Sequence, residues 1–255
     1  MSQDAAPEPA DVPASRTVVI IPTYNEIENL DSIVGRLRAA VPHADVLIAD
    51  DNSPDGTGKR ADELAEADSH IQVLHRPGKG GLGAAYLHGF AWAIEHGYDV
   101  VVEMDADGSH QPEQLPRLLA ALKDADLVLG SRWVAGGSTV NWPLLRQLIS
   151  RGGSLYARLA LGVKIRDVTG GYRAFRRSTL EGIGLEDVES QGYCFQIDLA
   201  NRAVQRGFRV VEVPIEFVER EVGDSKMSNK IVLEAMWRVT VWGWERRLKP
   251  RTGKA

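Results

Sequence analysis

The segment MDADGSH, residues 104–110, places two carboxylates in one short turn directly after an apolar run. At a separation of ~4 Å, Asp105 and Asp107 would repel each other by about 4 kcal/mol in a medium of effective dielectric constant ~20, and a cation between them would relieve this repulsion. Hard oxygen ligands at an open turn suit Mg²⁺ or Mn²⁺ that is shared with substrate phosphates. The segment therefore predicts a divalent metal site, with a solvated acidic turn as the alternative.

Two further segments with acidic and aromatic side chains follow apolar runs in the same way. They are IIPTYNE (20–26), with Tyr24 and Glu26, and IADDNSPDGT (48–57), with Asp50, Asp51 and Asp55. Each segment by itself is typical of an ordinary connection from a strand to a helix. Because ligands bind at the carboxyl ends of parallel strands, three such segments at one edge predict a binding site there.

A glycine-rich loop, RPGKGGLGAA, contains Gly78, Gly80 and Gly83 in the spacing of the dinucleotide fingerprint. The loop follows the third expected strand, however, and no acidic residue stands at the position that would bind a ribose. We therefore disfavour a dinucleotide site. A flexible loop, or a helix N-terminus close to a phosphate, is the favoured interpretation.

These segments connect strands and helices that alternate along the first half of the chain. We expect strands at 17–21, 46–50, 71–75, 100–104 and 127–130, and helices from Ile27 to about Leu37, near 57–67, from about Leu82 to Glu95 and from about Gln114 to Leu122. Repeated strand–helix units with β-branched strands predict an α/β fold whose mostly parallel sheet is covered on both faces.

After Arg132 the alternation ends, and VAGGSTVNWP leads to expected helices near 144–160 and 195–206 and an extended segment at 210–219. We find no linker or internal repeat there, so we predict one domain over 17–230. Residues 1–16 lack an apolar pattern and are expected to form a disordered tail. Residues 231–255 are expected to form an amphipathic helix and a tail rich in Trp and basic residues.

Composition excludes several protein classes. With 44% hydrophobic and 25% charged residues among 255, the chain is neither collagen-like nor wholly disordered, and the single Cys194 forms no internal disulfide. The net charge of −5 argues against nucleic-acid binding. Residues 226–255, in contrast, hold eight Lys or Arg against two Glu, which favours contact with anionic lipid headgroups. No apolar run is long enough to span a bilayer, and the start does not resemble a signal peptide.

Seven segments, in this order and spacing, resemble the polyprenol (dolichol) phosphate mannosyltransferases, an inverting group of family 2 glycosyltransferases. They are PTYNE, DDNSPDGT, MDADGSH, GSRW, NWPLLRQLISRG, DVTGGYRAF and EREVGDSK, and the resemblance covers about residues 17–248. It implies the Rossmann-like GT-A fold of nucleotide-diphospho-sugar transferases. It further implies transfer of mannose from GDP-mannose to a polyprenyl phosphate at the cytosolic face of the membrane.

The resemblance also implies roles for individual residues. On the donor side these are Pro22, Tyr24 and Glu26 in the nucleoside pocket, Ala49 and Asp51 at the base and ribose, Asp105, Ala106 and Asp107 at the donor and its metal, and Arg132, Arg220 and Lys226 at the diphosphate or sugar. Arg146 and Arg151 would hold the acceptor phosphate. Ser109 stands where some relatives place a third metal ligand, so its role is left open.

The implied reaction needs no general base, because the acceptor phosphate is already an anion at pH 7. The metal held by Asp105 and Asp107, together with Arg220 and Lys226, would stabilise the charge on the departing GDP. In-line attack would invert the anomeric centre and give a β-linked product. Asp198 stands where relatives with hydroxyl acceptors often keep a base, and we interpret it here as structural.

For residues 231–255, two interpretations remain side by side: an interfacial membrane anchor, and a helix packed on the sheet with some Trp in the core. We expect a cytoplasmic protein that lies peripherally on the inner face of the membrane, with a membrane-protein partner as a further option. The alternatives for the function are a UDP-glucose or UDP-aminosugar donor, and a catalytically idle subunit that binds sugar nucleotide or lipid. The residue chemistry does not separate guanine from uracil.

Overall fold

The computed structural model describes residues 15–188, 193–219 and 236–244. Its main sheet has seven strands: β1 (Thr17–Thr23), β2 (Asp45–Asp50), β3 (Ile71–His75), β4 (Val100–Glu103), β5 (Leu127–Ser131), β7 (Arg173–Arg176) and β8 (Val210–Pro214). Their spatial order is β3-β2-β1-β4-β7-β5-β8. All the pairs are parallel except those of β7, which runs antiparallel to β4 and β5. The predicted mostly parallel α/β sheet is confirmed.

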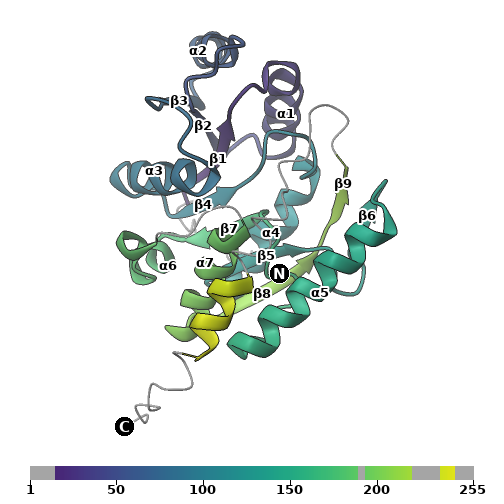
Figure 1. Ribbon diagram of the computed structural model, residues 1–255. Coiled ribbons are helices and arrows are strands. Elements are labelled where there is room, and N and C mark those ends of the chain that lie inside the picture. Colours follow the sequence, from purple (N-terminus) through teal and green to yellow (C-terminus); the bar gives the residue numbers. More distant parts are fainter. Residues whose placement is uncertain (1–14, 189–192, 220–235, 245–255) are drawn as a thin grey trace, which may run out of the picture.

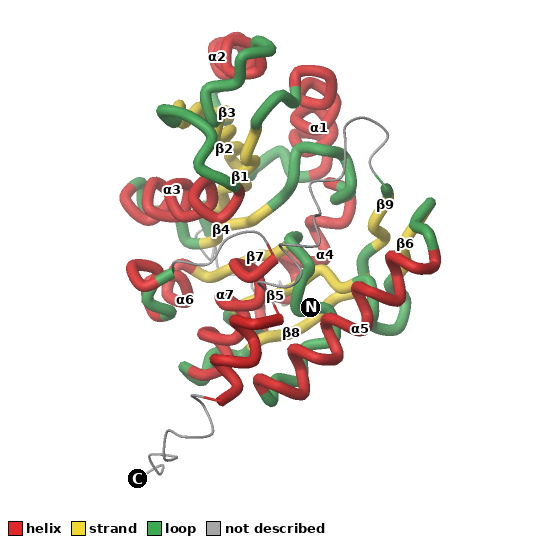
Figure 2. Tube along the Cα trace, in the orientation of Figure 1, coloured by secondary structure: helices red, strands yellow, loops and turns green. Residues whose placement is uncertain are grey.

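Helices cover both faces of this sheet (Figures 1 and 2). They are α1 (Ile27–Ala40), α2 (Thr57–Ala67), α3 (Leu82–Glu95), α4 (Leu115–Ala121), α5 (Leu144–Leu161), α6 (Arg177–Gly182) and α7 (Tyr193–Gln205), with short 3-10 turns η1 (Pro112–Gln114), η2 (Leu122–Asp124) and η3 (Leu185–Asp187). Residues 236–244 are also helical.

Alternating side chains of β1 divide the interior into two cores. Val18 and Ile20 belong to the core that includes Phe90 of α3, whereas Val19 and Ile21 belong to the core that includes Leu30 of α1. Successive side chains of a strand point to opposite faces, and a parallel sheet buried on both faces therefore carries continuous apolar strands. This is why the first half of the chain can be interpreted directly from its sequence.

The second half contains the elements that the sequence did not reveal. β7 inserts antiparallel between β4 and β5, and its residues 173–176, RAFR, lack the β-branched run of the other strands. The expected extended segment 210–219 divides at Pro214 into β8 and β9 (Glu216–Val218), and β9 pairs with β6 (Ser138–Val140) in a separate sheet. Proline cannot donate a ladder hydrogen bond, which fits the change of sheet at this position.

Candidate active site

The carboxyl ends of β1, β2 and β4 lie side by side because these strands are neighbours in the sheet. Pro22 on β1 pairs in register with Ala49 on β2, so these two residues of the predicted nucleoside pocket are adjacent. Tyr24 follows β1, Asp51 follows β2 and Asp105 follows β4 within two residues. The structure thus brings the three acidic segments to one edge of the sheet.

Asp105 and Asp107 lie in a tight turn stabilised by hydrogen bonds from backbone amides to side chains. The amide of Asp105 donates to Nδ1 of His110 over 3.1 Å, and the amide of Ser109 donates to Oδ1 of Asp107 over 3.1 Å. Gly108 adopts a φ of 73°, a left-handed conformation that glycine accepts without strain. The turn therefore holds both carboxyl groups at the end of β4.

Two buried side chains beneath this turn were not among the predicted site residues. The hydroxyl of Tyr86 on α3 donates to Oδ1 of Asp105 over 3.1 Å, and Tyr86 is fully buried. Burial raises the pKa of Tyr86 well above its usual value, so the phenol remains a hydrogen-bond donor. Burial lowers the pKa of His110, which favours the neutral ring that accepts the amide of Asp105. His110 lies inside MDADGSH, whereas nothing in the sequence distinguishes Tyr86 from a core residue.

The residues of the turn fit a metal ion that is shared with a substrate. Among residues 15–188, 193–219 and 236–244, no group of three or more His, Cys, Asp and Glu is arranged to hold a metal by protein ligands alone. Oγ of Ser109 is buried beside the two aspartates and has no hydrogen-bond partner among these residues. Mg²⁺ and Mn²⁺ commonly take one or two carboxylates, with substrate phosphates and water completing the shell. The third ligand role of Ser109 stays a prediction.

At the nucleoside end of the edge, Asp51 is buried in an ion pair with Arg76. The amide of Gly80 donates to Oδ2 of Asp51 over 3.0 Å, and Nζ of Lys79 lies 4.2 Å from the centre of the Tyr24 ring. The glycine-rich loop 76–81 therefore folds beside the predicted nucleoside pocket. A Cβ at position 80 would lie 2.6 Å from Nη2 of Arg76, so a larger residue there would require the end of the arginine to shift.

The other acidic residues at this edge bind neighbouring loop groups. Asp50 accepts hydrogen bonds from Oγ1 of Thr23 over 2.9 Å and from the hydroxyl of Ser53 over 2.6 Å. Asp55 accepts from the amides of Thr57 and Ile27 over 3.0 and 3.2 Å. These contacts connect the loops that follow β1 and β2. Glu26, from the predicted pocket, accepts from Asn29 over 2.9 Å at the start of α1.

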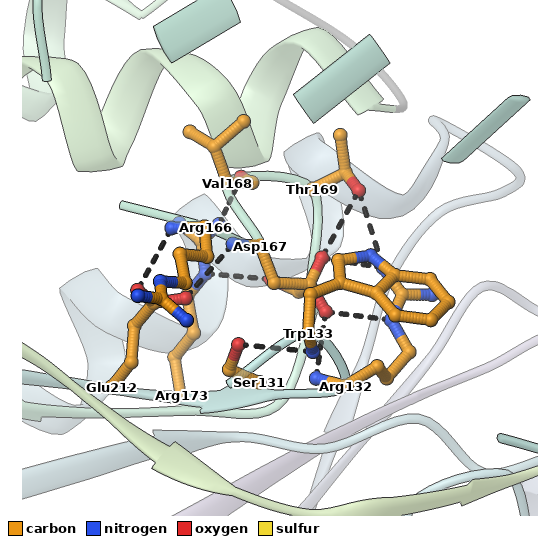
Figure 3. Close-up of polar contacts among 10 residues, drawn as sticks. Ser131, Arg132, Trp133, Arg166, Asp167, Val168, Thr169, Arg173 and Glu212 are labelled. Atoms are coloured by element: carbon orange, nitrogen blue, oxygen red, sulfur yellow. Dashed lines mark hydrogen bonds and ion pairs between the residues drawn. The ribbon is translucent and has the colours of Figure 1, made fainter. Parts of the chain in front are cut away.

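Arg132 follows β5 and forms a buried, two-pronged ion pair with Asp167 (Figure 3). Its Nε and Nη2 donate to the two carboxylate oxygens over 2.7 and 2.6 Å, and Nη2 also donates to Thr169 over 3.2 Å. Glu212 on β8 accepts the amides of Arg166 and Asp167 over 2.8 Å each. Asp167 therefore orients the guanidinium of Arg132. The contact of Arg132 with the donor stays a prediction.

A second buried arginine organises the loop before β7. Arg173 is fully buried and donates to the carbonyl groups of Val168, Gly170 and Gln196 over 2.8, 2.8 and 2.7 Å. Its Nε lies 3.9 Å from the carboxylate of Glu103, and burial raises the pKa of Glu103 to about 8. An acidic residue inside the apolar strand VVVEM is a signal that sequence reasoning left unused.

The predicted acceptor residues Arg146 and Arg151 lie on α5. Arg146 forms an ion pair with Glu219, and its guanidinium carbon lies 4.3 Å from the centre of the Trp142 ring. The guanidinium carbon of Arg151 lies 4.5 Å from the centre of the Trp133 ring.

Two predicted catalytic residues, Arg220 and Lys226, lie outside the described residues, so their roles stay predictions. Ala106, predicted to meet the donor, is buried between the two aspartates of the turn. Asp198 is buried and accepts a hydrogen bond from Nε of Arg202, one helical turn away, over 2.8 Å. The interpretation of Asp198 as structural stays a prediction.

Comparison with known proteins shows the family to which the chain belongs. The model of the family named glycosyl transferase family 2 matches residues 18–184. The chain is 59% identical to the undecaprenyl-phosphate mannosyltransferase of Micrococcus luteus over 93% of this chain and 99% of that protein. It is 57% identical to the polyprenol monophosphomannose synthase of Mycolicibacterium smegmatis over 98% of this chain and 96% of that protein.

Among solved structures, the fold resembles a glucosyl-3-phosphoglycerate synthase of Mycobacterium tuberculosis in complex with Mn²⁺, UDP and phosphoglyceric acid. The TM-score is 0.64 at 19% identity, over 94% of this chain and 81% of that one. The match supports the GT-A fold expected from the sequence. The chain is a glycosyltransferase that belongs to glycosyl transferase family 2 and, within it, to the polyprenol phosphate mannosyltransferases.

Proposed function

We propose that the protein transfers mannose from GDP-mannose to a polyprenyl phosphate with inversion, giving polyprenyl-phosphate β-mannose. One observation carries the proposal: the loops after β1, β2 and β4, which hold the residues predicted to bind the donor, meet at the edge of the sheet where Asp105 lies. The names of the two bacterial relatives support a polyprenyl phosphate acceptor and a mannosyl product.

The donor binds along this edge, with Tyr24, Ala49 and Asp51 at the nucleoside and Asp105 and Asp107 at the diphosphate. A divalent ion, Mg²⁺ or Mn²⁺, held by the two aspartates supplies positive charge where the departing diphosphate becomes more negative. The Mn²⁺ in the structure of the distant glucosyl-3-phosphoglycerate synthase supports this choice of ions. Arg220 and Lys226 stabilise the same charge, and Arg132 faces the donor with its guanidinium oriented by Asp167.

The acceptor needs no general base, because a phosphate monoester is already ionised at neutral pH. Asp198 stands where relatives with hydroxyl acceptors often keep a base. Its ion pair with Arg202 gives its carboxylate a structural partner and so supports a mechanism without a general base. Arg146 and Arg151 offset the repulsion between two approaching anionic groups, and the transfer then depends on positioning.

A lipid acceptor requires contact with a membrane surface, and α5 offers an apolar face for it. Leu144, Leu145, Leu148 and Leu159 are each exposed by 67% or more. The same helix carries three arginines and no acidic residue. This combination of apolar and basic side chains is typical of helices that lie in the membrane interface.

The helical segment 236–244 lies beside α5 (Figure 1). The hydroxyl groups of Tyr156 on α5 and Thr240 lie 2.5 Å apart, and Gly243 packs so closely that an added Cβ would lie 2.7 Å from the carbonyl oxygen of Ala160. Val239 is buried, whereas Trp237 and Trp244 are exposed by 69% and 68%. One face thus packs on the protein while another presents tryptophans, which combines both interpretations of this region.

No helix in the described part of the chain has the length and apolarity needed to cross a bilayer. From the exposed leucines and the arginines of α5, we place the enzyme peripherally on the cytosolic face of the membrane, in contact with anionic headgroups through α5 and segment 236–244, with a membrane-protein partner as an option.

The transfer reaction is tested by offering radiolabelled GDP-mannose or UDP-glucose together with a short polyprenyl phosphate. We expect label in the lipid fraction only with GDP-mannose, and mild acid should release it as mannose. Label from UDP-glucose alone would reject the choice of donor. A folded protein that transfers neither sugar would support the idle-subunit alternative.

Membrane contact is tested by flotation with vesicles that contain anionic lipid. Leu148→Glu should reduce the floated fraction, because it places a charge in the apolar face of α5. Gln72→Glu, which adds the same charge on β3, serves as the control and should float like the unaltered protein. Equal flotation of both variants would reject α5 as the contact surface.

A further inference from the structure

Two tryptophans lie against three arginines, of which Arg146 and Arg151 belong to α5 and Arg132 follows β5. The guanidinium carbon of Arg132 lies 5.4 Å from the centre of the Trp133 ring and 5.1 Å from that of Trp142. Arg151 lies against Trp133 at 4.5 Å, and Arg146 lies against Trp142 at 4.3 Å. All four distances fall within the ~6 Å over which a cation is attracted to an aromatic face. The rings and the guanidinium groups therefore form one packed unit.

These rings continue to the turn that holds Asp105. The Trp133 and Trp142 rings are 6.5 Å apart, Trp142 meets the edge of Phe217 at 5.2 Å, and Phe217 meets His110 at 5.5 Å. His110 accepts the amide hydrogen of Asp105. We call His110, Phe217, Trp142 and Trp133 the aromatic row. It links the metal-binding turn to α5 through side-chain contacts.

The three arginines beside the tryptophans differ in their ion pairs. Asp167 pairs with Arg132 and Glu219 pairs with Arg146. Arg151 is exposed and forms no ion pair within the described ranges of the chain. The positive charge of Arg151 is therefore left beside the apolar face of α5. An anionic group on a lipid that enters along this face would be attracted to that charge.

We infer that Trp133 and Trp142 are positioning residues for the acceptor phosphate, because they hold Arg151 and Arg146 at a fixed distance from the turn of Asp105. This inference rests on the proposed function. A long, flexible arginine loses less conformational freedom on binding when a ring already holds its guanidinium plane. The tryptophans act through the arginines and need not touch the substrate.

The effect is expected on the acceptor rather than on the donor. Trp142→Leu removes the ring against which Arg146 and Arg132 lie, but the two-pronged ion pair with Asp167 still holds Arg132. A cation–π contact at the partial exposure of the Arg146 side chain, 19%, corresponds to about a tenfold change in affinity. We expect the acceptor KM to rise about tenfold, with the Kd of GDP changed less than about twofold. Trp142→Phe should recover most of the loss, because it keeps an aromatic face. The indole nitrogen that it removes has no hydrogen-bond partner among the described residues.

The matched control is Trp92→Leu on α3. Trp92 also stacks on its neighbours, at 4.0 Å from the His96 ring and 5.7 Å from the Tyr98 ring, but it contacts none of the arginines above. A general loss of a half-buried indole would alter Tm in both variants, whereas only Trp142→Leu should alter the acceptor KM. An unchanged acceptor KM in Trp142→Leu, or an equal loss of GDP affinity, overturns the inference.

Fluorinated tryptophan at position 142 keeps the test decisive if Trp142→Leu does not fold. Fluorine withdraws charge from the ring face with little change of shape, so the acceptor KM should rise with fluorination while Tm stays constant. A KM that does not respond overturns the inference. If the unaltered protein transfers mannose to polyprenyl phosphate in the same assay, such a result leaves the proposed function intact; if it transfers none, the function itself fails.

Discussion

Replacing Tyr86 by Phe removes one oxygen atom from beneath the turn of Asp105 and Asp107, where we propose that the metal binds, and leaves the ring in place. The ring stacks on Phe195 with centroids 6.2 Å apart and on Phe90 at 6.1 Å, contacts that Phe would keep. The lost group is the hydroxyl that donates to Oδ1 of Asp105 over 3.1 Å. The variant is therefore expected to fold, with a fall in Tm of a few degrees from the lost hydrogen bond.

The magnitude follows from the type of hydrogen bond. A hydrogen bond to a charged group contributes roughly 1.5–3 kcal/mol, and each ~1.4 kcal/mol corresponds to a factor of ten. The carboxyl group of Asp105 is 30% exposed, so water replaces part of the lost interaction and the lower end of this range applies. We expect Mn²⁺ affinity in the presence of GDP to fall about tenfold, within the ~10–100-fold that is typical of residues behind metal ligands.

Calorimetric titration of Mn²⁺ into the GDP complex measures this affinity without turnover. Tyr98→Phe is the matched control, since it removes a hydroxyl that donates to Oδ2 of Asp45 over 2.7 Å at the opposite end of β2. Tyr98→Phe should bind Mn²⁺ like the unaltered protein. Equal Mn²⁺ affinity of all three proteins would refute the role of Tyr86, and an equal loss in both variants would assign the effect to general destabilisation.

Three further predictions concern other contacts of the site. Removal of divalent metal by a chelator, or Asp107→Asn, should abolish mannose transfer and leave Tm nearly unchanged; full activity after either treatment would exclude the metal. Arg76→Met should lower the free energy of unfolding by roughly 3–5 kcal/mol in denaturant titrations, because Asp51 would remain buried without its partner; an unchanged midpoint would contradict this. Arg146→Ala should raise the acceptor KM in transfer assays and leave GDP-mannose binding intact by calorimetry, whereas an equal loss of donor affinity would assign Arg146 to the donor.

The first half of the fold could be predicted because its signals are local. The helix α2 and the strand β3 match the ranges expected from apolar periodicity, and α3 begins at Leu82 and ends at Glu95 as expected. A parallel sheet buried on both faces requires continuous apolar strands, and such runs are visible without any knowledge of their neighbours. The strand β7 was missed for the opposite reason, because its sequence RAFR carries a buried arginine in place of a β-branched run.

The sequence by itself determined which acidic loops end the strands, and the resemblance assigned them a chemistry. Only the tertiary structure decided the partners of those residues: Arg76 with Asp51, Asp167 with Arg132, and Tyr86 with Asp105. These pairs join residues 25, 35 and 19 positions apart, and Arg146 meets Glu219 across 73 positions. Contacts over such separations depend on strand order and helix packing, whereas local periodicity reports only the neighbours along one element.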